Sequence, residues 1–292
     1  MPELQLTQGT LNYRDEGEGP AVVFVHGLLV NGRVWDDVMP FLGTRVRRIV
    51  PDLPLGSHPI PMRPDATLDP PALAAMIAEL IERLDLTDVT LVGNDTGGAL
   101  CQLVIARHPD RIGKLLLINC DAFENFPPRA FAPALTMLRR VPGLLALVAD
   151  LGRTRTGRRM AMKTAPLTVI PIRDELVESW VAPLRRRGVR RDALKVMRAI
   201  APEHTLGAVD GLRRFERPAI IVWGLRDVFF KVDDGERLVQ TLPQARLETV
   251  EAARTFVQLD APERVAELVL ELALPRAASP NGTVTPAAAA YL

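Results

Sequence analysis

The segment between residues 89 and 98 constrains the fold of this chain more than any other. Residues 89–92 form a mostly apolar run, typical of a buried strand, and apolar residues at helical spacing follow from residue 100. The turn between them consists of Gly93-Asn94-Asp95-Thr96-Gly97-Gly98. A strand that turns into a helix between residues this small holds its central side chain, here Asp95, in a strained and exposed position.

A carboxylate at such a turn limits the chemistry that the chain can perform. Serine in this place would indicate acyl transfer, whereas aspartate suits attack on an electrophilic sp3 carbon. The product of that attack is an ester between enzyme and substrate, which water must later cleave. If other segments cover Asp95, the loss of solvent should raise its pKa.

Strands and helices alternate along most of the chain. Apolar or alternating runs predict further strands at 4–12, 21–25, from 48, and at 114–120, 219–224 and 247–250. Helical spacing predicts helices at 34–41, 73–84, 236–242 and from 262, and Asp69 is the expected N-cap of the second of these. The alternation predicts an α/β protein with a doubly wound, mostly parallel sheet.

The alternation is interrupted by residues 121–217, which are helical in pattern, rich in proline and basic, with 19 Lys and Arg against 10 Asp and Glu. We expect a helical cap inserted over the sheet, which supplies most of a substrate pocket. The predicted organisation is a core of residues 1–120 and 218–274, the cap, and a flexible tail at 275–292, where Pro, Ala, Ser, Gly and Thr lack periodicity. The basic residues indicate a solvated helix face, or attraction of an anionic partner.

Composition excludes several classes of function. No aromatic residues interleave with the basic ones as in a nucleic-acid surface, and no metal or disulfide spacing is present. Cys101 and Cys120 are expected to be small core residues. Neither a signal pattern nor a membrane-spanning run occurs. We therefore expect a cytoplasmic monomer or homodimer that acts on a small organic molecule, without a metal or cofactor and without a nucleic-acid or membrane partner.

Five motifs together make the chain resemble the α/β-hydrolases of the branch that contains haloalkane dehalogenases and epoxide hydrolases. The resemblance covers about residues 4–272 and is weakest in the cap. The motifs are Phe24-Val25-His26-Gly27, Pro51-Asp52-Leu53-Pro54, the turn at Asp95, Trp223-Gly224-Leu225-Arg226-Asp227, and Thr255-Phe256-Val257. The resemblance implies the α/β-hydrolase fold.

The resemblance also implies roles for particular residues. Asp95 would be the nucleophile, the backbone amides of Leu28 and Thr96 would form the oxyanion hole, and Asp227 would orient a histidine base. That histidine should stand directly before Phe256, where this chain has Thr255. Among the four histidines, His58 and His204 are candidate replacements for the base. His26 belongs to the oxyanion turn, where a structural role and a catalytic role both remain open.

Other pocket residues that are typical of the branch are missing from this chain. Haloalkane dehalogenases place a tryptophan directly after the nucleophile and an amide soon after the His-Gly turn, whereas this chain has Thr96 and Leu28 in these places. Epoxide hydrolases use tyrosines of the cap, whereas the tyrosines here, Tyr13 and Tyr291, lie outside the cap. Asp121 and Glu124 are either a second acid of the site or caps of the first cap helix. The side chains that we expect in the pocket are Asn31, Trp35, Asn94, Asp121, Trp180, Thr255 and Phe256, with Asn31, Trp35 and Trp180 as candidate donors.

Three functions are compatible with these residues. The first is a hydrolase that acts through Asp95 on a bulky epoxide, halide or lactone despite an incomplete triad. The second is a lyase, cyclase or isomerase of secondary metabolism in which Asp95 is a general acid or base, because such reactions need no hydrolytic water. The third is a catalytically silent protein that retains the pocket for ligand binding.

Overall fold

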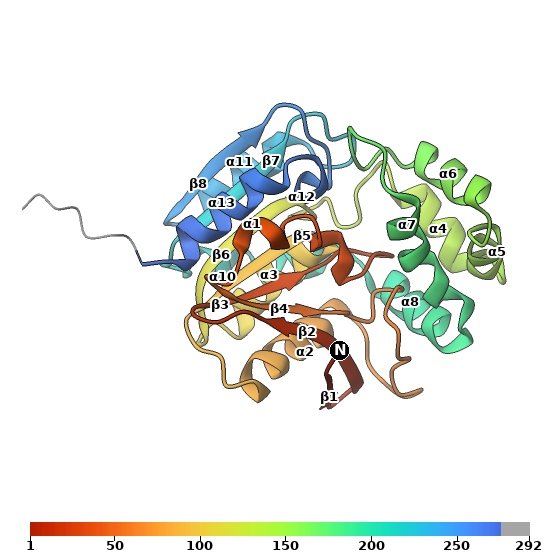
Figure 1. The fold of residues 1–292 in the computed structure, drawn as a ribbon, viewed down its shortest axis with the longest axis horizontal. Helices are drawn as coiled ribbons and strands as arrows, with labels where there is room; N and C mark the ends of the chain where they lie inside the picture. The colour runs from red at the N-terminus through yellow and green to blue at the C-terminus, as the bar shows by residue number, and fades with distance from the viewer. Residues whose placement is uncertain (276–292) are drawn as a thin grey trace, which may run out of the picture.

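The computed structural model of the protein describes residues 1–275 and contains one sheet with the strand order β1-β2-β4-β3-β5-β6-β7-β8 (Figure 1). The pairs β1–β2 and β2–β4 are antiparallel, and the other neighbours are parallel. The strands are β1 (Glu3–Leu6), β2 (Gly9–Glu16), β3 (Ala21–Val25), β4 (Arg47–Pro51), β5 (Val89–Asp95), β6 (Ile112–Cys120), β7 (Ala219–Gly224) and β8 (Ala245–Val250). The predicted α/β class and mostly parallel sheet are confirmed. The tail predicted from residue 275 lies, beyond that first residue, outside the described residues.

Helices cover both faces of the sheet. One face packs against α2 (Pro70–Arg83), α3 (Thr96–Arg107), α10 (Val209–Arg213) and α11 (Val232–Thr241), and the other against η1 (Gly32–Trp35), α1 (Met39–Leu42), α12 (Val257–Asp260) and α13 (Pro262–Ala273). The remaining helices are α4 (Ala132–Arg140), α5 (Leu144–Leu151), α6 (Arg155–Thr164), α7 (Asp174–Val181), η2 (Ala182–Arg185), α8 (Arg187–Ala199) and α9 (Pro202–Leu206).

Local sequence signals explain where several elements begin and end. Asp69 caps α2 by accepting a hydrogen bond from the Ala72 amide at 2.8 Å, as predicted. The strand expected at 4–12 is instead the hairpin of β1 and β2, because the chain turns at Thr7 and Gln8. The helix expected at 34–41 is divided into η1 and α1.

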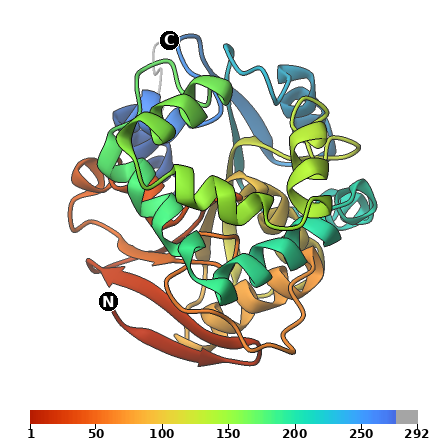
Figure 2. The ribbon, with the colours of Figure 1, turned by 90° about the vertical axis from the view of Figure 1, so that its right-hand side faces the viewer.

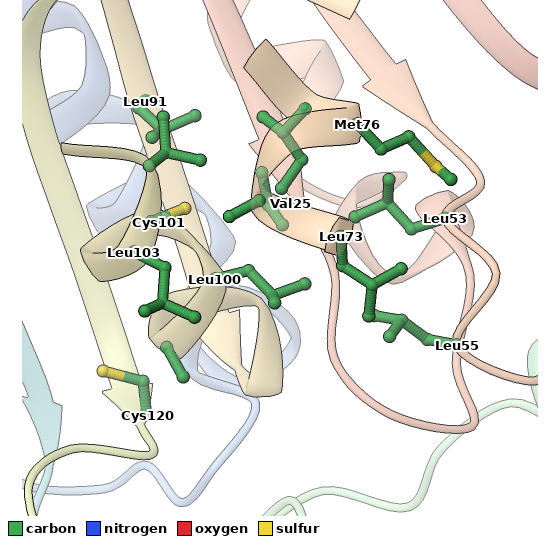
Figure 3. Close-up of a cluster of buried hydrophobic side chains, with 14 of the residues drawn as sticks. Val25, Leu53, Leu55, Leu73, Met76, Leu91, Leu100, Cys101, Leu103 and Cys120 are labelled. Atoms are coloured by element: carbon green, nitrogen blue, oxygen red, sulfur yellow. The ribbon is translucent and has the colours of Figure 1, made fainter. Parts of the chain in front are cut away.

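The core consists of an apolar cluster on each face of the sheet. β5 lies between these clusters, and its residues 89–94 are buried. On the face covered by α2 and α3, Leu91, Leu100 and Leu103 lie beside Cys101 and Cys120 (Figure 3). Both cysteines are free thiols and fully buried, so the expectation that they are small core residues is confirmed.

The helices from α4 to α8 gather at one end of the sheet, where they form a layer of their own (Figures 1 and 2). All of them lie between β6 and β7 in the sequence. The predicted cap also included α9 and α10, but these two helices pack against α3 of the core. The contact between α10 and α3 is close, since a Cβ added to Gly211 would lie 2.4 Å from the Cα of Ala106.

Candidate active site

Asp95 ends β5 and is the N-cap residue of α3. Its backbone has φ 55° and ψ −132°, a conformation that costs a non-glycine residue free energy and that marks functional turns. Small neighbours make the turn possible. A Cβ added to Gly97 would lie 2.4 Å from the carbonyl oxygen of Val25, so a larger residue would separate α3 from β3. The strained turn that the sequence predicted is therefore present.

Backbone amides hold one side of the Asp95 carboxylate. The Leu28 N–H donates to Oδ2 at 3.0 Å, and the Thr96 N–H also donates to the carboxylate. These are the two amides that the sequence predicted to form an oxyanion hole. The pKa of Asp95 is raised to about 7, chiefly by burial; the two amides oppose the shift, and the charge of Asp227 adds to it.

Asp227 lies near Asp95 at the end of β7 and has both carboxyl oxygens occupied. Oδ1 accepts hydrogen bonds from the Thr255 hydroxyl at 3.0 Å and from the Phe229 amide at 2.7 Å. Oδ2 accepts from the Asn119 side chain at 2.8 Å. Burial raises the pKa of Asp227, and these donors oppose the shift. Asp227 therefore orients a hydroxyl in the place where the resemblance implies an imidazole.

A cavity of about 160 Å³ lies in front of Asp95. Its polar lining comes from Asp95, Thr96, Asp121 and Thr255, and the indole of Trp180 also borders it. The Trp180 Nε1 is buried without a hydrogen-bond partner, and the ring contacts Phe256 edge-on at 5.8 Å between centroids. The cavity is thus apolar with a few convergent polar groups, which is typical of a small-molecule site.

Asp121 follows β6 and is 1% exposed. Its Oδ2 accepts a hydrogen bond from the Thr96 hydroxyl at 3.1 Å, and its Oδ1 has no partner. Burial raises the pKa of Asp121 well above its usual range, and the charge of Asp95 adds to the shift. Glu124 lies apart from this group and pairs with Arg237 at 2.6 Å. Neither residue caps α4, because Phe131 is the N-cap.

None of the four histidines lines this cavity within residues 1–275. His26 is held by backbone at both ring nitrogens: Nε2 accepts from the Leu53 amide, and Nδ1 donates to the Gly27 carbonyl, each at 2.9 Å. Burial lowers its pKa. The His58 Nε2 lies 3.3 Å from Asp192, and the His204 Nε2 lies 3.0 Å from the carbonyl of Ala199. Both ring nitrogens of His26 are thus occupied by backbone groups, and His58 and His204 contact other parts of the protein.

Three other residues expected in the pocket lie elsewhere. Asn94 is buried behind the turn, where its amide donates to the carbonyl of Thr255 at 2.8 Å. Asn31 caps η1 and donates to the carbonyl of Ser179 at 3.1 Å, which ties η1 to α7. Trp35 packs against Phe24 in the core at 5.3 Å between centroids. The two asparagines are used in hydrogen bonds and Trp35 in packing, and none of the three lines this cavity.

The sequence analysis missed most of the apolar lining and one polar residue. Asn119 supports Asp227, and a signal for it was present, since it is a polar residue at the end of the apolar run of β6. No comparable signal marked the other lining residues, which come from loops and cap helices distant in sequence. They are Leu29, Val30, Phe126, Pro127, Pro128, Phe131, Met162, Ala165, Leu167, Ile200, Phe229 and Phe230.

Within residues 1–275, no group of His, Cys, Asp and Glu side chains has the arrangement of a metal site. In the same part of the chain, each helix is too short or too polar to cross a bilayer.

A mostly parallel sheet flanked by helices, with a strained strand-to-helix turn beneath an inserted helical layer, is the α/β-hydrolase architecture. The chain matches the model of the Alpha/beta hydrolase family over residues 22–268 and belongs to that family. It is 26% identical over 278 residues to haloalkane dehalogenase 2 of Mycobacterium tuberculosis, and the aligned region covers 91% of this chain and 92% of that protein. It is also 26% identical over 272 residues to a 2-hydroxy-6-oxononadienedioate/2-hydroxy-6-oxononatrienedioate hydrolase of Burkholderia vietnamiensis, covering 91% of each.

Solved structures show the same fold. An α/β-hydrolase-fold protein of Burkholderia ambifaria superposes with a TM-score of 0.76 at 21% identity, over 92% of this chain and 97% of that one. A haloalkane dehalogenase of Bradyrhizobium elkani gives a TM-score of 0.75 at 19% identity, over 92% and 96%. At this level of identity the likeness concerns the fold alone.

Proposed function

We propose that this protein is a hydrolase in which Asp95 attacks an electrophilic carbon of a compact organic molecule and forms an ester intermediate. The observation that carries the proposal is the position of one carboxyl group. Asp95 lines the cavity, while the Leu28 amide holds its Oδ2 at 3.0 Å. The backbone amides of Leu28 and Thr96 are suitably placed to stabilise the oxyanion that forms when water attacks the ester.

The cavity narrows the class of substrate. Its volume of about 160 Å³ is close to that of an apolar protein cavity of about 150 Å³ that binds benzene. This volume favours a compact epoxide, alkyl halide or lactone over the bulky substrate that we expected from the sequence. The apolar walls favour a neutral molecule, and the unpaired Trp180 N–H is the group that would receive a departing halide or a ring oxygen.

Intact-protein mass spectrometry tests this proposal directly. The wild type and Asp95→Asn would each be incubated with a panel of small alkyl halides, epoxides and lactones. The wild type should yield either a covalent adduct of the substrate's mass or a hydrolysed product, and Asp95→Asn should yield neither. If the wild type gives no adduct and no product with the whole panel, the proposal is wrong.

A non-hydrolytic reaction is the second candidate, and the titration of Asp95 favours it. A carboxyl group with a pKa of about 7 suits proton transfer at neutral pH, because it can both hold and release a proton there. Such a reaction would be lost in Asp95→Asn but would give no adduct, and its product would carry no oxygen from labelled water. Incorporation of that oxygen would rule out this candidate.

A further inference from the structure

Asp121 has a carboxyl oxygen that nothing in its surroundings satisfies. The residue lines the cavity, is 1% exposed, and uses only Oδ2, which accepts the Thr96 hydroxyl hydrogen at 3.1 Å. Its Oδ1 is buried without a partner. An ionised oxygen left in that state carries a desolvation cost, whereas a protonated carboxyl turns the same atom into an O–H donor. The geometry therefore calls for a proton on Oδ1, next to the space that a substrate would occupy.

The carboxyl groups of Asp95 and Asp121 both line the cavity but differ in their hydrogen-bond donors, and Thr96 donates to both of them. Its backbone N–H donates to Asp95, and its hydroxyl donates to Asp121. Asp95 receives a second N–H, from Leu28, and these two amides stabilise a negative charge. Asp121 has one neutral donor only. Where two carboxyl groups share a site and their surroundings differ in this way, one is the anion and the other is the acid.

We propose that Asp121 is the acid–base catalyst of this site and replaces the histidine that the triad lacks. This inference rests on the proposed function of Asp95. In the first step, the Asp95 carboxylate attacks a ring carbon of an epoxide, the carbon–oxygen bond breaks, and Asp121 donates its proton to the departing oxygen. The products of this step are an ester at Asp95 and a carboxylate at Asp121. An alkyl halide needs no such proton, because the halide leaves as an anion.

In the second step the roles reverse. The Asp121 carboxylate takes a proton from water, the hydroxide oxygen adds to the ester carbon of Asp95, and the amides of Leu28 and Thr96 hold the resulting oxyanion. Collapse breaks the bond to the product oxygen. That oxygen takes the proton of the carboxylic acid formed at Asp95, which regenerates the Asp95 carboxylate and the protonated Asp121. For an alkyl halide, Asp121 is still protonated after ester formation. It releases that proton to solvent once the charge of Asp95 is gone, and it takes a new proton from water in the second step, so one proton leaves the site in each cycle.

The reversal has a physical cause. Esterification removes the negative charge of Asp95, and that charge is one of the reasons for the raised pKa of Asp121. Asp234, the other titratable group that raises the pKa of Asp121, does not line the cavity and takes no part in these steps. Asp121 therefore holds its proton before ester formation and can persist as a carboxylate afterwards.

The other acidic and basic groups of the site have no free atom for this role. Both oxygens of Asp227 are saturated by the side chains of Thr255 and Asn119 and by backbone amides. Besides Asp95, Asp121 supplies the one carboxyl group that lines the cavity within residues 1–275.

The test compares Asp121→Asn with the wild type in single-turnover mass measurements. The amide keeps the size of the side chain and can still accept the Thr96 hydrogen bond. With a small alkyl halide, Asp121→Asn should form the ester within about threefold of the wild-type rate but hydrolyse it about 100-fold or more slowly, so the adduct persists. With an epoxide, ester formation should itself fall by about 100-fold. The matched control is Glu124→Gln, the same change on a nearby carboxyl group that lies outside the cavity, and it should leave both rates unchanged.

Two results would overturn the inference while leaving the proposed function intact. One is hydrolysis of the ester at the wild-type rate by Asp121→Asn. The other is an equally slow hydrolysis by Asp121→Asn and Asp121→Glu, because a restored carboxyl group should recover at least about tenfold of the rate. If Asp121→Asn does not fold, the wild type carries the test, since its ester hydrolysis should slow in acid as one group is protonated, and a rate independent of pH from about 5 to 9 would contradict the proposal. Absence of both ester and product in the wild type would instead refute the role of Asp95.

Discussion

Thr255 donates its hydroxyl hydrogen to Asp227 at 3.0 Å, in the place where the resemblance implied a histidine. Asn94 holds the same residue from behind, through a 2.8 Å hydrogen bond to its carbonyl. The carboxylate that orients a base is thus retained, together with the support of the loop, but the side chain that it orients cannot accept a proton near neutral pH. The site therefore retains the acid of a triad, Asp227, but has no histidine base at position 255.

Restoring the histidine is the first prediction. Thr255 lines the cavity, so an imidazole in its place has room to extend and can donate to Asp227. Thr255→His should accelerate hydrolysis of the Asp95 ester by about 10-fold to 100-fold, less than a fully evolved base provides. Thr255→Val is the control, since it removes one donor to Asp227 and should lower the free energy of unfolding by about 1 kcal/mol without any gain in rate. An unchanged rate of ester hydrolysis in Thr255→His would contradict the prediction.

The rate of ester formation should depend on pH through Asp95. Only the carboxylate attacks carbon, and the pKa of Asp95 is raised to about 7 by burial. The rate should therefore increase from pH 5 to pH 9 and reach half of its maximum near pH 7, when an alkyl halide is the substrate and no leaving-group proton is needed. The measurement is the initial rate of adduct formation by mass spectrometry. A half-maximum near pH 4 would mean that Asp95 is solvated and unperturbed.

The same shift predicts that Asp95→Asn stabilises the protein in alkaline solution. The folded-state pKa of about 7 exceeds the ordinary value of 3.8, so between these values the folded state holds a proton that the unfolded chain has lost. Stability contributed by that proton is present at low pH and is lost as the pH rises through 7. Asp95→Asn removes the titration, so its free energy of unfolding should exceed that of the wild type by about 1–3 kcal/mol at pH 8 and by little at pH 4.

Urea denaturation at both pH values measures this difference, with equal m-values as the check that the unfolded states are comparable. A variant less stable than the wild type at pH 8 would contradict the prediction.

The parts of this fold that the sequence predicts are those where local pattern and tertiary context agree. The strand, strained turn and helix around Asp95 follow from an apolar run and small residues, and α2 follows from its cap at Asp69 and its apolar spacing. The hydrogen-bond partners of Asn31 and His58 could not be predicted in the same way. Their partners, Ser179 and Asp192, are more than 130 residues away in the sequence, and no local signal records such contacts.

The same reason limits prediction of the site. The types of residue at Asp95, Asp121 and Asp227 are visible in the sequence, because each stands where a strand ends. Which carboxyl oxygens find partners depends on loops that meet only in the folded protein. The unpaired Oδ1 of Asp121 is therefore a property of the structure alone.

Gly27 should be intolerant of any side chain. A Cβ added there would lie 2.0 Å from the Asp95 Oδ2, so Gly27→Ala must displace the nucleophile or break its bond to Leu28. We expect ester formation to fall by at least about 100-fold and the free energy of unfolding by about 1–3 kcal/mol, as for other overpacked sites. The control is Gly43→Ala, because a Cβ added to Gly43 would meet no atom within 4 Å beyond its chain neighbours, and φ there is 59°. That change should cost about 1 kcal/mol through backbone strain and leave the rate unaltered.

The indole of Trp180 should contribute to the reaction and little to stability. Its Nε1 has no hydrogen-bond partner and borders the cavity, so Trp180→Phe breaks no hydrogen bond within the protein. If this N–H receives the departing halide, ester formation from an alkyl halide should fall by about 10-fold to 100-fold, the loss expected for a hydrogen bond to a charged group. Trp35→Phe is a close control, because the Trp35 Nε1 is also buried and unpaired but does not line the cavity. Equal effects of the two variants on the rate of ester formation would show that the indole of Trp180 acts through packing and not through its N–H.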